Sequence, residues 1–196
     1  MTRIIQISDP HIVPEGELAY GHVETSAPLK SCVETINRIL PNIGPIDMVI
    51  VTGDLTDYGT TEEYQRFRDI MEPLKIPYRV IPGNHDNVSV MRANFSDNEW
   101  MPKSGPINWT AEFTDLALIA LDTKVADQEY GNLSEKSLSY LQDKLANLNN
   151  KSVIVAIHHP PILTGMKTKD KYNLRDSEKL KTILSEFPGE LKLVCG

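Results

Sequence analysis

The sequence predicts an α/β (α+β) fold in one domain, and three observations support this prediction. Short apolar, β-branched runs recur along the chain, and stretches with helical apolar spacing separate them. Hydrophobic residues make up 40% of the 196 residues, which is enough for one core. Because no internal repeat, linker or low-complexity segment divides the chain, we expect a single domain over residues 1–196.

The strands are predicted from the apolar runs. A short segment at residues 109–113 is expected to pair with the run that follows it, through a turn near Asp115. Residues 50–51 and 153–155 are β-branched and almost wholly apolar, as is typical of strands that are covered on both faces. The clearest runs cover residues 4–8, 47–52, 78–81, 116–121, 153–157 and 191–194.

Helices are predicted between these strands. Thr60 and Glu63 have the spacing of a capping box, and apolar residues at helical spacing follow over residues 64–74. Ser134 is expected to cap a second helix, whose apolar stripe covers residues 138–148. The other expected helices cover residues 27–40 and 177–186.

Composition and charge exclude several kinds of partner. The net charge of −7 argues against a broad nucleic-acid or membrane surface, because both need concentrated positive charge. No stretch is long enough to span a membrane, and the N-terminus has no features of a signal peptide. Cys32 and Cys195 are expected to be buried thiols rather than a disulfide. We therefore expect a cytoplasmic protein that binds neither a nucleic acid polymer nor a membrane.

Asp9-Pro10-His11 follows the first apolar run. The proline restrains the spacing, so the carboxylate and the imidazole lie on the same side of an extended chain and can meet one cation. By itself the pair also fits an aspartate turn cap beside a surface histidine. Three further runs end in polar residues, and reactive groups in open α/β sheets gather beyond the carboxyl ends of strands.

Gly53-Asp54 ends the second run. Glycine permits a tight turn or a close backbone approach, so the Asp54 carboxylate could reach the same edge of the sheet and bridge two cations. The alternative is an ordinary turn at the end of a strand, which Asp57 and Gly59 would favour.

Gly83-Asn84-His85-Asp86 follows the third run. The amide oxygen of Asn84 is a suitable ligand for a hard or borderline cation. His85 can hydrogen-bond a phosphate or leaving-group oxygen, and Asp86 is expected to orient its ring. The alternative is a polar β-turn, which does not account for the histidine.

Two adjacent histidines, His158 and His159, follow the fifth run. Because side chains alternate along a strand, only one of them is expected to face the cations. We assign His158 to the site and His159 to packing or support. His22 is interpreted as a solvated loop histidine, and the charged stretch 167–172 as mobile surface.

Taken in order, D-x-H, G-D, G-N-H-D and H-x-P resemble the calcineurin-like metallophosphoesterase superfamily over residues 4–196, closest to class III cyclic nucleotide phosphodiesterases and bacterial glycerophosphodiesterases. The resemblance implies a β-sandwich flanked by helices. It also implies a binuclear centre with two ions of iron, manganese, zinc or cobalt. In that family pattern, His85 and Asp86 would be catalytic, Asp54 would bridge the two ions, and the full ligand set would be Asp9, His11, Asp54, Asn84 and His158.

The reaction implied by this resemblance is hydrolysis of a P–O bond in a small phosphodiester, with a 3',5'-cyclic nucleotide as the leading substrate. Two cations lower the pKa of a water between them and neutralise charge at phosphorus. A glycerophosphodiesterase or a phosphomonoesterase is the alternative among enzymes. The alternative of another class is an inactive, metal-poor interaction module.

The chain departs from the family pattern at Cys195-Gly196. In the family, a strand that ends in such a pair is followed by His-x-His, with one histidine for each metal. We therefore expect a domain that is truncated at its C-terminus and has three protein ligands for each ion. Missing strands are expected to leave an exposed sheet edge, through which copies of the chain could form a homo-oligomer.

Overall fold

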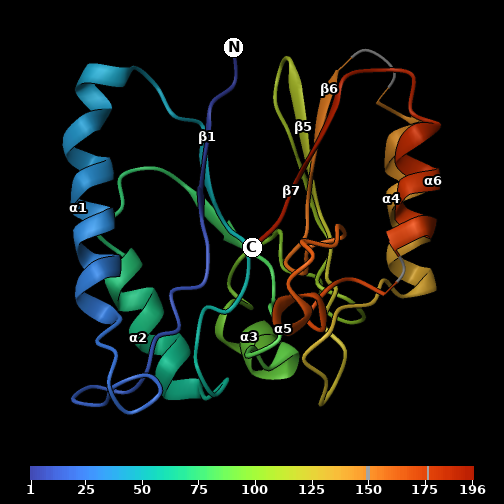
Figure 1. Ribbon diagram of the computed structural model, residues 1–196. Coiled ribbons are helices and arrows are strands. Elements are labelled where there is room, and N and C mark those ends of the chain that lie inside the picture. The colour runs from blue at the N-terminus through green and yellow to red at the C-terminus, as the bar shows by residue number, and fades with distance from the viewer. Residues whose placement is uncertain (149–150, 176) are drawn as a thin grey trace.

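The computed structural model describes residues 1–148, 151–175 and 177–196. Two sheets face each other in the middle of the molecule, and helices lie on the outer side of each sheet (Figure 1). This arrangement confirms the expected α/β sandwich flanked by helices.

The first sheet is parallel and has the order β1-β2-β3, formed by β1 (Ile4–Ile7), β2 (Met48–Val51) and β3 (Tyr78–Val80). Every residue of β2 is buried, as its apolar sequence predicts for the central strand of a covered sheet. The register pairs Ile7 with Val51 and Val51 with Val80, so these strands end at the same level.

The second sheet has the order β4-β5-β6-β7. The hairpin of β4 (Trp109–Glu112) and β5 (Leu116–Ala120) is antiparallel, as expected from the turn near Asp115. β6 (Ser152–Ala156) and β7 (Leu191–Val194) continue the sheet in parallel with β5. All the predicted strands are therefore confirmed, with small shifts at their ends.

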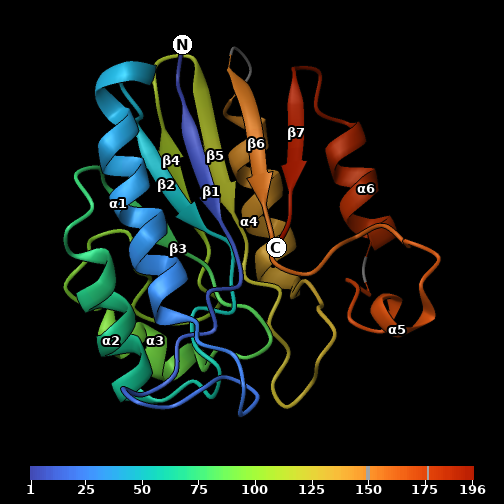
Figure 2. The ribbon, with the colours of Figure 1, turned by 60° about the vertical axis from the view of Figure 1, so that its left-hand side comes forward.

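The four predicted helices cover the outer faces of the sheets. α1 (Ser26–Ile43) and α2 (Thr61–Met71) pack beside the first sheet, while α4 (Glu135–Ala146) and α6 (Ser177–Ser185) pack beside the second (Figure 2). The Thr60 capping box of α2 is present with both of its hydrogen bonds, and the Ser134 hydroxyl caps α4. One core cluster fills the space between the sheets and reaches α1 and α2, and a second lies under α4 and α6.

Two short helices were not predicted, α3 (Val88–Asn94) and α5 (Lys167–Asp170). The side chain of Asn87 caps α3 by accepting from two backbone amides. α5 lies in the charged stretch that was interpreted as mobile surface. The carboxylate of Asp170 accepts from the backbone amides of Thr164 and Gly165, so this stretch forms an ordered loop.

Both cysteine thiols are free, so no disulfide joins Cys32 and Cys195. Cys32 is half-buried and Cys195 is exposed, which makes the expectation of two buried thiols wrong for Cys195. None of the helices in the described part of the chain has the length and apolar character that a membrane crossing requires.

Candidate metal centre

The ends of β1 and β2 bring three predicted ligands together. One ligand atom from each of Asp9, His11 and Asp54 lies within 4.8 Å of the other two. His11 Nε2 is 3.9 Å from Asp9 Oδ1 and 3.6 Å from Asp54 Oδ2. Asp54 and the ring of His11 are mostly shielded from water, while Asp9 lies at the exposed rim. The group therefore has the composition and spacing of a cation site.

The second oxygen of Asp54 faces the ends of β3 and β6. His158 Nε2 lies 3.5 Å from Asp54 Oδ1 and 3.2 Å from the amide oxygen of Asn84. The two oxygens of one buried carboxylate are thus directed to two different groups of donors. The structure brings together all five residues that were predicted as ligands.

The hydrogen bonds of His11 and His158 determine which ring nitrogen of each faces Asp54. His158 Nδ1 donates to the Thr52 carbonyl at 2.8 Å, and His11 Nδ1 lies 3.2 Å from a carboxylate oxygen of Asp57. A neutral ring that donates through Nδ1 presents a lone pair at Nε2. Both lone pairs then point toward oxygens of the Asp54 carboxylate. Such facing acceptors fit a cation between them.

Two glycines allow the strand ends to approach so closely. A Cβ atom at Gly53, which has φ 104°, would lie 2.4 Å from His158 Nδ1. At Gly83, a Cβ atom would lie 2.2 Å from Asp54 Oδ1 and 2.4 Å from the Asp54 amide nitrogen. The sequence motifs G-D and G-N-H-D therefore need glycine for contact with the site, not only for a turn.

Strained backbone gathers around this centre. Among the described non-glycine residues, the five with positive φ are Asp9 (54°), His11 (43°), Tyr20 (54°), Asp54 (48°) and Asp127 (57°). This left-handed conformation costs a residue with a Cβ about 1–2 kcal/mol. Strain of this kind persists where the surrounding structure imposes it, often at functional sites. Three of the five residues are predicted metal ligands.

Asp57 orients both His11 and His85, a role that sequence analysis missed. The Asp57 carbonyl accepts from His85 Nδ1 at 2.8 Å, and an oxygen of its buried carboxylate lies 3.5 Å from the same nitrogen. The rings of His11 and His85 meet edge to face with centroids 4.6 Å apart. Sequence analysis named Asp57 only as a residue that would favour a turn after Asp54. Its carboxylate, three residues after Asp54, was the feature that could have indicated a role in the site.

The expectation that Asp86 orients the His85 ring is corrected by the structure. The Asp86 carboxylate is buried and accepts from the amides of Leu55 and Gly83 and the hydroxyls of Thr56 and Tyr64. Burial raises the pKa of Asp86 to about 6, and these donors oppose the shift by favouring the charged form. Asp86 therefore joins three segments behind the site.

His159 lies behind His158 and faces away from the centre. Its Nδ1 is 2.7 Å from the Thr123 hydroxyl, and its ring meets the His158 ring edge to face. Burial, assisted by His158 and Lys124, lowers the pKa of His159 to about 3, so the ring is neutral at ordinary pH. This position agrees with the predicted supporting role. His22 is exposed and contacts the backbone of Tyr20.

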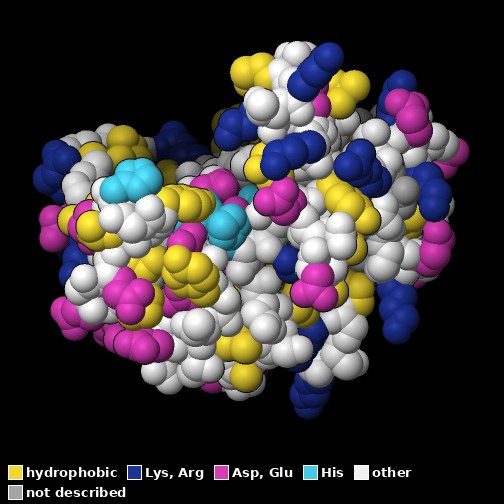
Figure 3. All heavy atoms as spheres, turned by 60° about the horizontal axis from the view of Figure 1, so that its bottom comes forward, with side chains coloured by type: hydrophobic (Ala, Val, Ile, Leu, Met, Phe, Trp, Pro, Cys, Tyr) yellow, Lys and Arg dark blue, Asp and Glu magenta, His cyan; other side chains and the backbone are white. Residues whose placement is uncertain are grey.

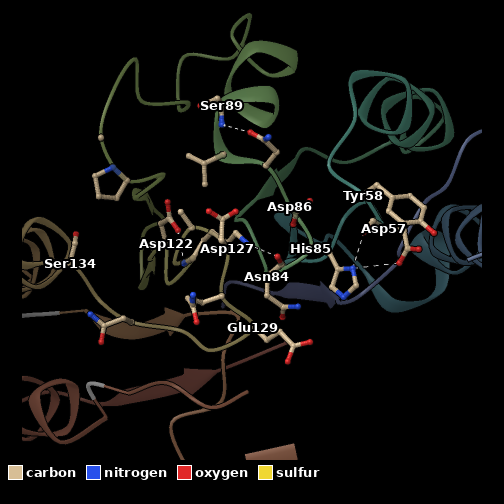
Figure 4. Close-up of a pocket in the computed structure, with 18 residues that line it drawn as sticks. Asp57, Tyr58, Asn84, His85, Asp86, Ser89, Asp122, Asp127, Glu129 and Ser134 are labelled. Atoms are coloured by element: carbon tan, nitrogen blue, oxygen red, sulfur yellow. Dashed lines mark hydrogen bonds and ion pairs between the residues drawn. The ribbon is translucent and has the colours of Figure 1, made fainter. Parts of the chain in front are cut away.

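A cavity of about 800 Å³ opens beside His85 and Asn84. Figure 4 shows His85, Asp57 and Tyr58 on one side of this cavity and Asp122 and Ser134 on the other. Acidic and histidine side chains lie close together in the middle of the face that carries these loops (Figure 3). The cavity has room for part of a substrate whose phosphate lies at the centre.

A family model for calcineurin-like phosphoesterases matches residues 2–196. The chain belongs to the calcineurin-like phosphoesterase family. Among curated relatives, a probable glycerophosphodiester phosphodiesterase of Arcobacter nitrofigilis, GpdQ, is 37% identical over 98% of this chain and 70% of the relative. The 3',5'-cyclic adenosine monophosphate phosphodiesterase CpdA of Escherichia coli K12 is 29% identical over 99% of this chain and 68% of the relative.

Among solved structures, a purple acid phosphatase of yellow lupin seeds matches the fold with a TM-score of 0.68. The two chains are 14% identical, and the match covers this whole chain and 37% of the lupin chain. Membership of the calcineurin-like phosphoesterase family confirms the prediction of a phosphoric ester hydrolase and implies divalent metal ions. The oxygen and imidazole donors at the strand ends fit such ions.

Proposed function

We propose that this calcineurin-like phosphoesterase hydrolyses small phosphodiesters with two metal ions. Asp9, His11 and Asp54 would hold one ion, and Asp54, Asn84 and His158 would hold the other. The position of Asp54 carries the proposal, because its two oxygens lie 3.6 Å and 3.5 Å from Nε2 of His11 and Nε2 of His158. A carboxylate placed in this way could bind one ion through each oxygen.

Bound ions would supply a reactive hydroxide and neutralise the phosphate charge. The residues of the chain then have separate tasks. Because Asp57 holds His85 through Nδ1, the Nε2 atom of His85 is left to act on the substrate. A proton at Nε2 could hydrogen-bond a phosphate oxygen or pass to the leaving alkoxide. The Asp57 carboxylate fixes His11 in the same way, so one residue orients a ligand and the acid.

For the substrate, we propose a 3',5'-cyclic nucleotide, with a glycerophosphodiester as the second candidate. The similarity to a 3',5'-cyclic adenosine monophosphate phosphodiesterase of Escherichia coli supports the first, and the 37% identity to a probable glycerophosphodiester phosphodiesterase supports the second. The donor set suits iron, manganese, zinc and cobalt alike. A cytoplasmic location and self-association into a homo-oligomer stay predictions.

Metal content and manganese-dependent hydrolysis of bis(p-nitrophenyl) phosphate test this proposal. The chain is expected to bind about two ions and to turn over, whereas Asp54→Ala is expected to lose at least about 100-fold in activity and most of the bound metal. Cyclic AMP, a glycerophosphodiester and a phosphomonoester would then rank the substrates. A folded chain with neither metal nor turnover would favour the interaction module instead.

A further inference from the structure

We propose that Tyr20 determines specificity in this site, by giving the organic group of a bound phosphodiester an aromatic surface to pack against. This inference rests on the proposed function and adds the class of substrate that the site favours. Phosphodiesters that carry a planar aromatic group, such as a nucleobase, would bind better than phosphodiesters with aliphatic alcohols alone.

The ring of Tyr20 lies beside His11, which is a proposed metal ligand, and His85, which is the proposed acid. Its centroid is 5.8 Å from the His11 ring and 6.3 Å from the His85 ring, and it stands nearly perpendicular to the latter at 82°. The side chains of His11 and His85 are 15% and 30% exposed, whereas Tyr20 is 57% exposed. Tyr20 is therefore the outermost ring of this cluster, where a group extending from the phosphate would meet it.

The backbone holds Tyr20 at this position. Ala19 and Val23 exchange two backbone hydrogen bonds of 2.9 Å each, and the Gly21 amide donates to the Leu18 carbonyl at 3.0 Å. Ala19 is fully buried, so the base of this small loop is anchored in the protein. These hydrogen bonds hold the backbone on both sides of Tyr20 and place its ring beside the centre.

A tyrosine is an unexpected residue for the left-handed backbone conformation at position 20. At φ 54°, glycine or asparagine would fit with less strain than a tyrosine. An exposed ring also gains little from packing within the chain itself. Three other residues with positive φ, Asp9, His11 and Asp54, follow strands of the first sheet, and all three are predicted ligands. A tyrosine with the same backbone beside the same centre fits a role in contact with the substrate.

The chemistry of the ring decides the class of substrate. An aromatic face stacks on any nucleobase and packs more weakly against a flexible aliphatic chain. Loss of one stacking partner typically weakens binding of a base by about tenfold or more. The benefit of Tyr20 should therefore depend on the organic group and not on the phosphate that all substrates share.

Steady-state kinetics with Tyr20→Leu and Tyr20→Phe, on the manganese-loaded full chain, test this inference. For cyclic AMP and bis(p-nitrophenyl) phosphate, Tyr20→Leu is expected to raise KM by about tenfold, and Tyr20→Phe is expected to restore it. For glycerophosphoethanolamine, the expected change in KM is less than about threefold. Tyr130→Leu is the matched control, because Tyr130 packs under the Arg175 guanidinium, outside the ring cluster.

Binding gives a second readout. Calorimetry with 5'-AMP and with glycerol 3-phosphate, on the same metal-loaded proteins, should show about a tenfold weaker Kd for 5'-AMP only in Tyr20→Leu. Equal losses for both ligands, or a parallel loss of bound metal, would overturn the inference and leave the proposed function standing. A wild-type chain that binds metal but neither ligand would overturn both. No change in Tyr20→Leu would overturn the inference alone.

Discussion

The two sides of the candidate centre are held in place by different means. On the side of the first sheet, the backbone itself is strained at Asp9, His11 and Asp54, and glycines allow the close approach. On the side of the second sheet, His158 follows a regular strand and is fixed by one hydrogen bond to Thr52 and by the buried His159 behind it. The first side is set by backbone geometry and the second by side-chain burial.

The largest effect is expected from filling the contact at Gly53. In Gly53→Ala, the new Cβ would overlap the His158 ring, so we expect at least about a 100-fold loss of activity and a lower free energy of unfolding, by about 2–4 kcal/mol. Gly165→Ala is the matched control, because Gly165 also has positive φ but nothing lies within 4 Å of its added Cβ. Activity assays and denaturant unfolding compare the two; equal losses would show that strain alone matters.

A smaller loss of activity is expected when Asp57 no longer orients the ring of His11. Asp57→Ala removes the carboxylate that holds His11 and leaves the backbone carbonyl that holds His85. We expect about a 10- to 100-fold loss of metal affinity or activity, as is usual when the partner of a ligating histidine is lost. Asp143→Ala, on the exposed face of α4, is the control. Unchanged metal affinity and turnover in Asp57→Ala would contradict this role.

Acidification is expected to change the free energy of unfolding in opposite directions through His159, on the side of the second sheet, and Asp86, on the side of the first. The pKa of His159 is lowered from 6.5 to about 3, so protonation of the unfolded chain destabilises the fold as pH falls below 6.5. The pKa of Asp86 is raised to about 6, so its contribution stabilises the fold at low pH and is lost as pH rises through 6. When the pH falls from 7 to 5, we expect the free energy of unfolding to fall by about 2 kcal/mol through His159 and to rise by about 1 kcal/mol through Asp86.

Substitution of either residue should therefore change the pH profile in opposite directions. The metal-free His159→Gln protein is expected to gain stability on acidification from pH 7 to 5, because only the Asp86 contribution remains. Asp86→Asn is expected to lose stability more steeply than the wild type. Urea unfolding at several pH values, with a chelator present, measures both. Profiles that move in the same direction would contradict the assignment.

The smallest effects are expected at the helix caps. Thr60→Ala removes the bond from the Glu63 amide to the Thr60 hydroxyl next to the first sheet, and Ser134→Ala removes the bond from the Ser137 amide to the Ser134 hydroxyl next to the second sheet. We expect each variant to lose about 1 kcal/mol in the free energy of unfolding. Thermal unfolding would measure both losses, and an unchanged stability in either variant would contradict the role of that cap.

Sequence reasoning predicted the strands, and it named candidate ligands that the fold brings together, because both predictions depend on local pattern. Apolar runs identify β2 and β6, and the parallel order of strands places Asp54, Asn84 and His158 at one edge. The direction of a side chain after the strand end is not local. Asp86 was expected to face His85, but the turn directs its carboxylate into the protein and brings Asp57 to the ring instead.

The local sequence pattern did not predict two further features, the helix α3 and the position of Tyr20. α3 has no long apolar stripe, because a short helix capped by Asn87 depends on tertiary contacts rather than on periodicity. Sequence analysis did not single out Tyr20, because its left-handed backbone and its distance from the histidine rings become visible only in the fold.

The candidate ligands around Asp54 come from both sheets, so metal binding would also affect the stability of the fold. Asp54 and Asn84 come from the first sheet, while His158 comes from the second. A cation held by these three side chains would cross-link the two sheets, because the sheets could not separate without releasing the cation. At a metal concentration 100 times Kd, such linkage would add about 2.7 kcal/mol to the free energy of unfolding. Resistance to heat would then report how fully the centre is loaded.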